Sequence, residues 1–188
     1  MSERPLYIPI ILGTTRQGRM SRAAAELVKQ ELQKNTEVQT TLIDIAQMPL
    51  PTGDAGEAIK HADFAAHMER ADALVVVAPE YNHGYPGLLK HVLDSCLKEY
   101  IHKAVGIVGV SAGPFGGTRV IENLLPVMRE LGLVTIFWDV NFSSVQKAFT
   151  PEGGLIDQAY VRRIDKFAKE LIWMGKTLRY GREHITVN

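Results

Sequence analysis

The chain has 188 residues, of which 46% are hydrophobic and 22% are charged. This balance is typical of a globular protein, and the length predicts a single domain that spans residues 1–188. The 21 basic and 21 acidic residues give a formal net charge of zero. A neutral chain argues against a general nucleic-acid or anionic-membrane surface and against a small acidic electron carrier, so we expect neither a nucleic acid nor a membrane as a partner.

Cysteine content and the start of the chain indicate where the protein works. Cys96 is the only cysteine, so no internal disulfide can form, and a reducing, cytoplasmic location is expected. The apolar start of the chain is interrupted by Pro9 and predicts a first strand instead of a secretory signal. No apolar run approaches the roughly 20 residues that span a bilayer.

Apolar runs alternate with helical patterns along the chain. The runs predict strands at 6–13, 38–45, 73–80, 104–112 and 133–140. Apolar residues at spacings of three and four predict helices at 20–34, 59–71, 86–96, 118–131 and 156–178. Pro86 suits the first turn of its helix, whereas Pro126 predicts a kink or a break.

Five strands with intervening helices predict an α/β protein with a five-stranded parallel sheet and helices on both faces. In such sheets ligands bind beyond the carboxyl ends of the strands. The loops that follow the first, third and fourth strands are therefore the candidates for a site. Their sequences are GTTRQGRMS at 13–21, PEYNHGYPG at 79–87 and SAGPFGG at 111–117.

The first loop, 13–21, has the composition of an anion-binding turn. A nucleotide-triphosphate loop, G-x-x-x-x-G-K-[ST], needs a lysine and a hydroxyl after Gly18, where this chain has Arg19 and Met20. A dinucleotide turn, G-x-G-x-x-G, needs a glycine in place of Thr15. Both alternatives therefore lack residues that their ligands require.

The residues that are present in this loop suit a terminal monophosphate. Backbone N–H groups at the start of the following helix attract an anion, and the hydroxyls of Thr14, Thr15 and Ser21 can donate further hydrogen bonds. The guanidinium groups of Arg16 and Arg19 can offset the charge of the phosphate. A capped turn with two solvated arginines is the alternative interpretation of the same residues.

The second loop, 79–87, combines aromatic and polar residues that suit a planar ring. Tyr81 and Tyr85 offer stacking surfaces, and Asn82 with the neighbouring backbone amides can donate to carbonyls and nitrogens of a ring. His83 is expected on the surface instead of in catalysis. Glu80 has no evident partner and suits either a general base or a subunit contact.

The third loop, 111–117, is rich in glycine. Gly113, Gly116 and Gly117 remove side chains where a flat ligand or a second chain comes close, although a flexible turn that caps the next helix would have the same composition. Ser111 lacks the G-x-S-x-G surroundings of a hydrolase nucleophile. We assign no catalytic residue and no metal site to the chain, and this absence indicates that a cofactor supplies the reactivity.

Together the stretches LGTTRQGRMS, PEYNHGYPGLLKHVLD and SAGPFGGTR resemble the NADPH-dependent FMN reductase family, whose fold is a flavodoxin-like three-layer sandwich. The resemblance implies non-covalent FMN. Its phosphate would be surrounded by Thr14, Arg16, Arg19, Met20 and Ser21. Its isoalloxazine ring would be lined on one side by Pro79, Glu80, Tyr81 and Asn82, and on the other edge by Ser111, Gly113 and Gly116.

The resemblance also implies an activity: a hydride from NADPH or NADH passes through FMN to a small acceptor such as a flavin, quinone, azo compound or metal oxyanion. A flavodoxin-type electron carrier that does not oxidise NAD(P)H is the alternative. Relatives are usually homodimers or homotetramers. This chain departs from many of them at Arg19, Ser21 and the pair His83–Gly84. Arg119, beside the third loop, is a candidate for docking an anionic group.

Overall fold

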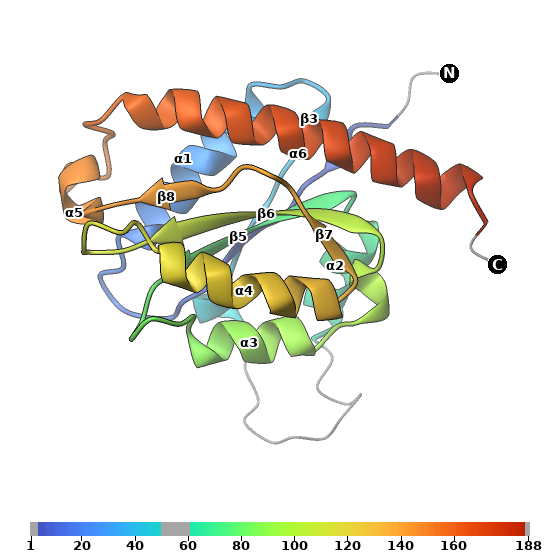
Figure 1. Cartoon of the computed structure of the whole chain (residues 1–188), viewed down its shortest axis with the longest axis horizontal. Coiled ribbons are helices and arrows are strands. Elements are labelled where there is room, and N and C mark those ends of the chain that lie inside the picture. The colour runs from blue at the N-terminus through green and yellow to red at the C-terminus, as the bar shows by residue number, and fades with distance from the viewer. Residues whose placement is uncertain (1–3, 50–60, 187–188) are drawn as a thin grey trace.

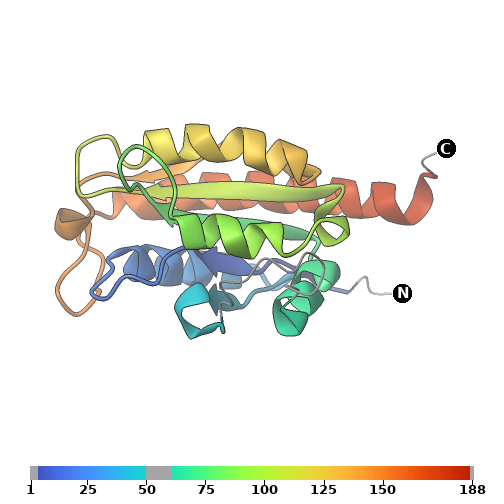
Figure 2. The ribbon, with the colours of Figure 1, turned by 90° about the horizontal axis from the view of Figure 1, so that it is seen from below.

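The computed structural model describes residues 4–49 and 61–186. A parallel sheet lies between two layers of helices, as Figures 1 and 2 show, which confirms the predicted α/β sandwich. The strands pair in the order β4 (Leu42–Asp44), β2 (Ile10–Leu12), β5 (Ala73–Pro79), β6 (Lys103–Val110) and β7 (Leu133–Thr135), and β8 (Val140–Phe142) also pairs with β6.

Helices cover both faces of this sheet. The longer ones are α1 (Ser21–Gln33), α2 (Ala62–Arg70), α3 (Gly87–Asp94), α4 (Thr118–Glu130) and α6 (Ala159–His184). Apolar residues of α1 and α6 form one buried cluster with one face of the strands, and those of α2, α3 and α4 form a second cluster with the other face. The two central strands, β5 and β6, are buried along their whole length, because both of their faces are covered.

The sheet has six strands instead of the predicted five, because the last predicted strand is divided into β7 and β8. Thr135 pairs with Val105, and Val140 pairs with Val108. Four residues, 136–139, therefore face only two residues of β6, and the surplus leaves the ladder as a bulge. Phe137 and Trp138 of this bulge are exposed and pack edge to face at 4.7 Å.

The first two predicted strands are also divided. Besides β2 and β4, the chain forms β1 (Leu6–Tyr7) and β3 (Val38–Gln39), which pair with each other in a separate two-stranded sheet. Pro9 separates β1 from β2, and a proline has no N–H to donate to a ladder. Pro9 therefore divides the predicted first strand into two short strands.

The helices bear on two predictions about prolines: the break at Pro126, one of two alternatives beside a kink, does not occur, and the position of Pro86 is corrected. Helix α4 continues through Pro126, so the chain does not break there. Pro126 lies on the exposed face of α4, where water can satisfy the carbonyl that loses its partner. Pro86 precedes α3 as its N-cap and is not part of the first turn. Residues 59–60 of the predicted second helix lie outside the described residues, and the described part begins at Ala62.

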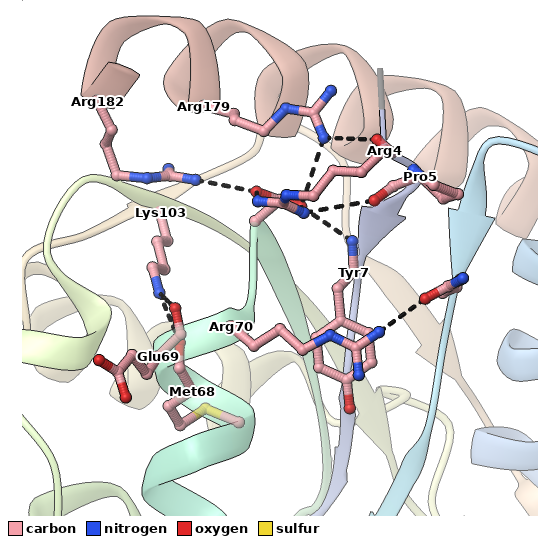
Figure 3. Close-up of polar contacts among 11 residues, drawn as sticks. Arg4, Pro5, Tyr7, Met68, Glu69, Arg70, Lys103, Arg179 and Arg182 are labelled. Carbon is pink, nitrogen blue, oxygen red and sulfur yellow. Dashed lines mark hydrogen bonds and ion pairs between the residues drawn. The ribbon is translucent and has the colours of Figure 1, made fainter. Parts of the chain in front are cut away.

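At the amino end of β5, the fully buried carboxylate of Asp72 ties distant segments together, and Figure 3 labels the arginines around it, Arg4, Arg179 and Arg182. Asp72 accepts hydrogen bonds from Arg4 Nη1 and Nη2 at 2.6 and 2.9 Å, from Arg182 Nη2 at 3.2 Å and from the Tyr7 backbone N–H at 3.0 Å. Arg179 of α6 lies 3.7 Å away. This edge of the sheet joins the start of the chain to α6 and is opposite to the edge where the candidate loops leave.

Candidate functional site

The three candidate loops leave the sheet at one edge, because β2, β5 and β6 are parallel neighbours. They lie together at the left of Figure 1. Side chains connect them in pairs: Thr14 of the first loop bonds to Tyr81 of the second, and Glu80 of the second bonds to Arg119 after the third. The structure therefore brings the predicted loops into one site.

Thr14 connects the first loop to the second. Its side chain is buried, with the residue 2% exposed, and its hydroxyl lies 2.8 Å from the hydroxyl of Tyr81. It also accepts the Arg16 backbone N–H at 3.3 Å. The guanidinium carbon of Arg16 lies 5.8 Å from the centre of the Tyr81 ring, a distance at which a cation and an aromatic face attract each other.

The amino end of α1 presents unused hydrogen-bond donors. Ser21 is the first residue of this helix and is 2% exposed, yet its hydroxyl has no hydrogen-bond partner among the described residues. Met20, the N-cap, makes no side-chain cap, and the first turn holds no acidic residue. A buried hydroxyl without a partner calls for a ligand, and the positive end of the helix favours an anionic one.

The two arginines of the first loop have different surroundings. Arg19 donates from Nη2 to Asp44 and from Nη1 to the Arg16 carbonyl oxygen at 3.3 Å. Its side chain is 13% exposed. Arg16 is exposed and forms no ion pair within the described part of the chain. The Arg16 guanidinium is therefore available to an incoming anion, whereas Arg19 has only its buried Nε without a hydrogen-bond partner among the described residues.

Sequence patterns did not point to Asp44, although it belongs to this region. It is the last residue of β4, at the same edge of the sheet as the three loops. Its position directly after an apolar run, at the carboxyl end of a predicted strand, was the signal that could have found it.

The second loop turns through a tight hairpin. Tyr81 and Gly84 exchange backbone hydrogen bonds at 2.9 and 3.0 Å, and Asn82 and His83 have positive φ angles of 49° and 68°. Two consecutive positive φ angles define a type I′ turn. Asn123 of α4 donates to the His83 carbonyl at 2.8 Å, which fixes the turn from outside while the Asn82 and His83 side chains stay exposed.

Glu80 has a partner that the sequence did not reveal. Its carboxylate accepts Arg119 Nη1 at 2.9 Å and the Arg119 backbone N–H at 3.3 Å. Glu80 thus caps the amino end of α4 and holds the second loop against the third. The Arg119 guanidinium also lies 4.6 Å from the centre of the exposed Phe115 ring. The ion pair occupies the Glu80 carboxylate and makes the Arg119 guanidinium less available to a docking anion.

The glycines of the third loop serve two different needs. Gly116 has a φ of 63°, and a Cβ there would meet Asn141 Cβ and Ser143 Oγ at 2.8 Å, so the packing of the loop itself requires glycine. A Cβ on Gly113 would meet nothing within 4 Å. Ser111 donates from Oγ to the Gly113 carbonyl at 2.9 Å, which shapes the loop around this open space.

These features fit FMN. Among the described residues, the edge combines a buried hydroxyl without a partner, a positive helix end, a guanidinium without an ion pair and open space beside Gly113. Pro79, the last residue of β5, is buried beside them. The described ranges contain no group of three histidine, cysteine or acidic residues that could hold a metal ion.

Comparison with known proteins supports this interpretation. The family model of NADPH-dependent FMN reductases matches residues 6–147. The NAD(P)H-dependent FMN reductase PA1204 of Pseudomonas aeruginosa is 32% identical over 62% of this chain and 67% of its own length. The quinone reductase of Escherichia coli is 32% identical over 68% of this chain and 71% of its own length.

Solved structures show the same fold at lower identity. The flavoenzyme FerB of Paracoccus denitrificans, an NAD(P)H:(acceptor) oxidoreductase, superposes with a TM-score of 0.76 at 18% identity, over 92% of this chain and 98% of its own. An archaeal flavodoxin superposes with a TM-score of 0.60 at 12% identity, over 92% and 98% of the two chains. The fold is flavodoxin-like, and the chain belongs to the NADPH-dependent FMN reductase family, as an NAD(P)H oxidoreductase that uses FMN.

Proposed function

We propose that the edge formed by the three loops holds FMN and that the protein passes a hydride from NADPH or NADH through it to a small acceptor. Flavins, quinones, azo compounds and metal oxyanions are the candidate acceptors. The observation that carries the site is the buried Ser21 hydroxyl without a partner at the positive end of α1. Bound FMN would supply the two-electron carrier that no side chain of the chain provides.

In this proposal the first loop anchors the phosphate. The Ser21 hydroxyl and the backbone N–H groups at the start of α1 donate to the phosphate oxygens, and Arg16 offsets their charge. Thr14 has a supporting role, because its hydrogen bond to Tyr81 fixes the second loop relative to the first. The Met20 and Arg19 backbones complete the turn.

The second and third loops would bind the ring. Pro79 to Asn82 border one side of it, and Ser111, Gly113 and Gly116 border the other edge. Backbone N–H groups of the type I′ turn are donors that can stabilise added negative charge on the ring. Glu80 holds the two loops at a fixed separation through Arg119. The chain therefore contributes position and hydrogen-bond donors, and no side chain is needed as an acid or base.

Named relatives support the acceptor class. One relative is a quinone reductase, and another is an NADPH azoreductase of a Bacillus species that is 29% identical over 63% of this chain. Both act on small molecules, as their names state. We further propose a homodimer or homotetramer, a single domain over residues 1–188 and a cytoplasmic location, the last supported by the single buried cysteine, Cys96. Within the described residues, no helix is both long and apolar enough to cross a bilayer.

An anaerobic absorbance experiment tests the activity. The purified protein, after addition of FMN and removal of the excess, is expected to be yellow and to bleach when NADPH or NADH is mixed with it without oxygen. A steady-state panel of the four acceptor types with each nicotinamide then identifies the acceptor and the preferred donor. A protein that retains FMN but stays yellow would be a flavodoxin-type carrier, and one that fails to take up FMN would remove both functions.

Arg16→Ala tests the anchor directly. We expect this substitution to raise the dissociation constant of FMN by about 10- to 150-fold, because a hydrogen-bonded charge pair contributes about 1.5–3 kcal/mol. The rate of hydride transfer at saturating FMN should be close to that of the wild type. Flavin fluorescence titration measures the first quantity and stopped-flow absorbance the second. An unchanged affinity for FMN would show that Arg16 is not a phosphate ligand.

A further inference from the structure

Asp44, at the carboxyl end of β4, joins two neighbouring segments through both of its carboxylate oxygens. Oδ1 accepts the Ala46 N–H at 3.0 Å and so caps the short 3₁₀ helix η1 (Ile45–Gln47). Oδ2 accepts Nη2 of Arg19 and, at 3.3 Å, Nη1 of Arg22. The side chain of Asp44 is only 10% exposed, so this is a partly desolvated, charge-assisted arrangement.

The guanidinium of Arg19 is held on two sides. Nη2 binds Asp44, and Nη1 donates to the carbonyl of Arg16 at 3.3 Å. The same side chain therefore closes the first loop upon itself and ties it to β4. The loop enters α1 at Met20, directly after Arg19. A planar guanidinium has the rigid fork needed to bind two acceptors at once, which the single ammonium of lysine does not offer.

The three arginines in and after the first loop differ in their ion pairs. Arg19 and Arg22 share the one carboxylate of Asp44, whereas Arg16 takes part in none of the ion pairs given for the described residues. A phosphate at the start of α1 would thus meet the Arg16 guanidinium, which forms no ion pair within the described residues, together with the neutral backbone N–H groups and the Ser21 hydroxyl. Arg19 is already bound by an acceptor that carries the same charge sign as the phosphate.

We propose that Asp44 is a positioning residue for the FMN phosphate. It holds the Arg19 guanidinium, and this brace keeps the first loop in the shape in which its N–H groups and the Ser21 hydroxyl converge on one anion. In this role Nη1 and Nη2 of Arg19 shape the site, because both are already hydrogen-bonded, and only its buried Nε has no partner among the described residues. The inference rests on the proposed phosphate site and adds to it a residue from outside the three loops.

The test is the affinity of the apoprotein for FMN, measured by the quenching of flavin fluorescence. Asp44→Asn keeps an oxygen for the η1 cap but removes the carboxylate, and we expect it to raise the dissociation constant of FMN about tenfold. Arg19→Ala should raise it by a similar factor. Because both substitutions remove the same brace, the double variant should bind no more weakly than either single variant.

Asp94→Asn is the matched control, since it also removes one carboxylate from an ion pair. Asp94 pairs with Lys90 on the surface of α3, where it is 47% exposed, and its loss should change the affinity by less than about twofold. Binding by Asp44→Asn that equals or exceeds that of the wild type would overturn the proposal, because it would mean that a released Arg19 serves as a phosphate ligand. Effects that multiply in the double variant would also overturn it.

If Asp44→Asn does not fold, Arg19→Lys tests whether Arg19 acts by bridging two acceptors or only by its positive charge. Lysine keeps the positive charge but cannot bridge Asp44 and the Arg16 carbonyl together. The brace predicts that Arg19→Lys binds FMN as weakly as Arg19→Ala, and near-wild-type binding by Arg19→Lys would contradict it. A wild-type protein that does not bind FMN at all would instead refute the proposed function, so the two failures are distinguishable.

Discussion

Lys103, the first residue of β6, is a buried lysine that completes the end of a helix. Its Nζ donates to the carbonyl oxygens of Met68 and Glu69 at 2.6 and 2.7 Å, near the carboxyl end of α2 (Figure 3). Burial, and then the charge of Arg182, lowers the pKa of Lys103 from 10.5 to about 8. The neutral amine still has two N–H groups, so it can keep both hydrogen bonds.

The lowered pKa of Lys103 predicts a rise of stability with pH. Between about 8 and 10.5 the native protein has released this proton while the unfolded chain still binds it, so the free energy of unfolding increases with pH in that window. Lys103→Met removes the titration. The difference in free energy of unfolding, wild type minus variant, should therefore increase with pH across the window. Urea unfolding at several pH values between about 8 and 10.5 measures it, and a difference that does not vary with pH across this window would contradict the assignment.

At the scale of elements, β6 depends on a glycine where α6 crosses it. A Cβ on Gly106 would lie 2.3 and 2.5 Å from Cζ and Cε2 of Phe167, and 3.3 Å from Ile136 Cδ1. The ring of Phe167 is fully buried, so it has little room to move. The helix and the bulge after β7 therefore approach the sheet closely because this position has no side chain.

Gly106→Ala should lower the free energy of unfolding by about 1–3 kcal/mol, because an extra methyl group in a packed core forces its neighbours out of place. Gly181→Ala is the matched control. Gly181 lies within α6, and a Cβ there would meet nothing within 4 Å. Alanine favours a helix over glycine, so the control should stabilise the protein by about 0.5–1 kcal/mol. Urea denaturation measures both, and equal effects of the two substitutions would exclude the packing explanation.

At the scale of the whole molecule, the buried ion-pair cluster and the proposed FMN site lie at opposite edges of the sheet. The Asp72 cluster lies where β5 begins, and the three loops leave where β2, β5 and β6 end. Asp72 joins the start of the chain, β5 and α6 through Arg4, Arg179 and Arg182. Removal of this one carboxylate would take away a fully buried anion that faces Arg179 and Arg182, whose side chains are 7% and 21% exposed, whereas the side chain of Arg4 is 54% exposed.

Asp72→Asn should therefore lower the free energy of unfolding by about 3 kcal/mol or more, with the affinity of the folded protein for FMN unchanged. Asp165→Asn is the control: Asp165 pairs with Lys169 at 2.7 Å on the exposed face of α6, and a surface pair contributes about 0–1 kcal/mol. Denaturant unfolding measures the stability of both variants, and FMN titration measures their affinity for the cofactor. Similar losses of stability in both variants, or weaker FMN binding by Asp72→Asn, would show that the two edges are not independent.

The sequence by itself determined the layered fold and the edge at which the three candidate loops meet. Hydrophobic periodicity is a local property, so it predicted the buried strands β5 and β6, the helices around them and the three loops that meet beyond the strand ends. The composition of the first loop predicted a monophosphate, because residues required for a triphosphate or a pyrophosphate are absent at Arg19, Met20 and Thr15.

Only the tertiary structure decided how the side chains of these loops are paired. The partners of Thr14, Arg19 and Glu80 lie 67, 25 and 39 residues away along the chain. Such pairs depend on strand register and on where each element ends, which no local pattern encodes. The bulge between β7 and β8 has the same origin, because its length depends on which residues of β6 pair with each of these two strands. For this reason the sequence located the first loop, whereas the fold showed that Asp44 holds its Arg19.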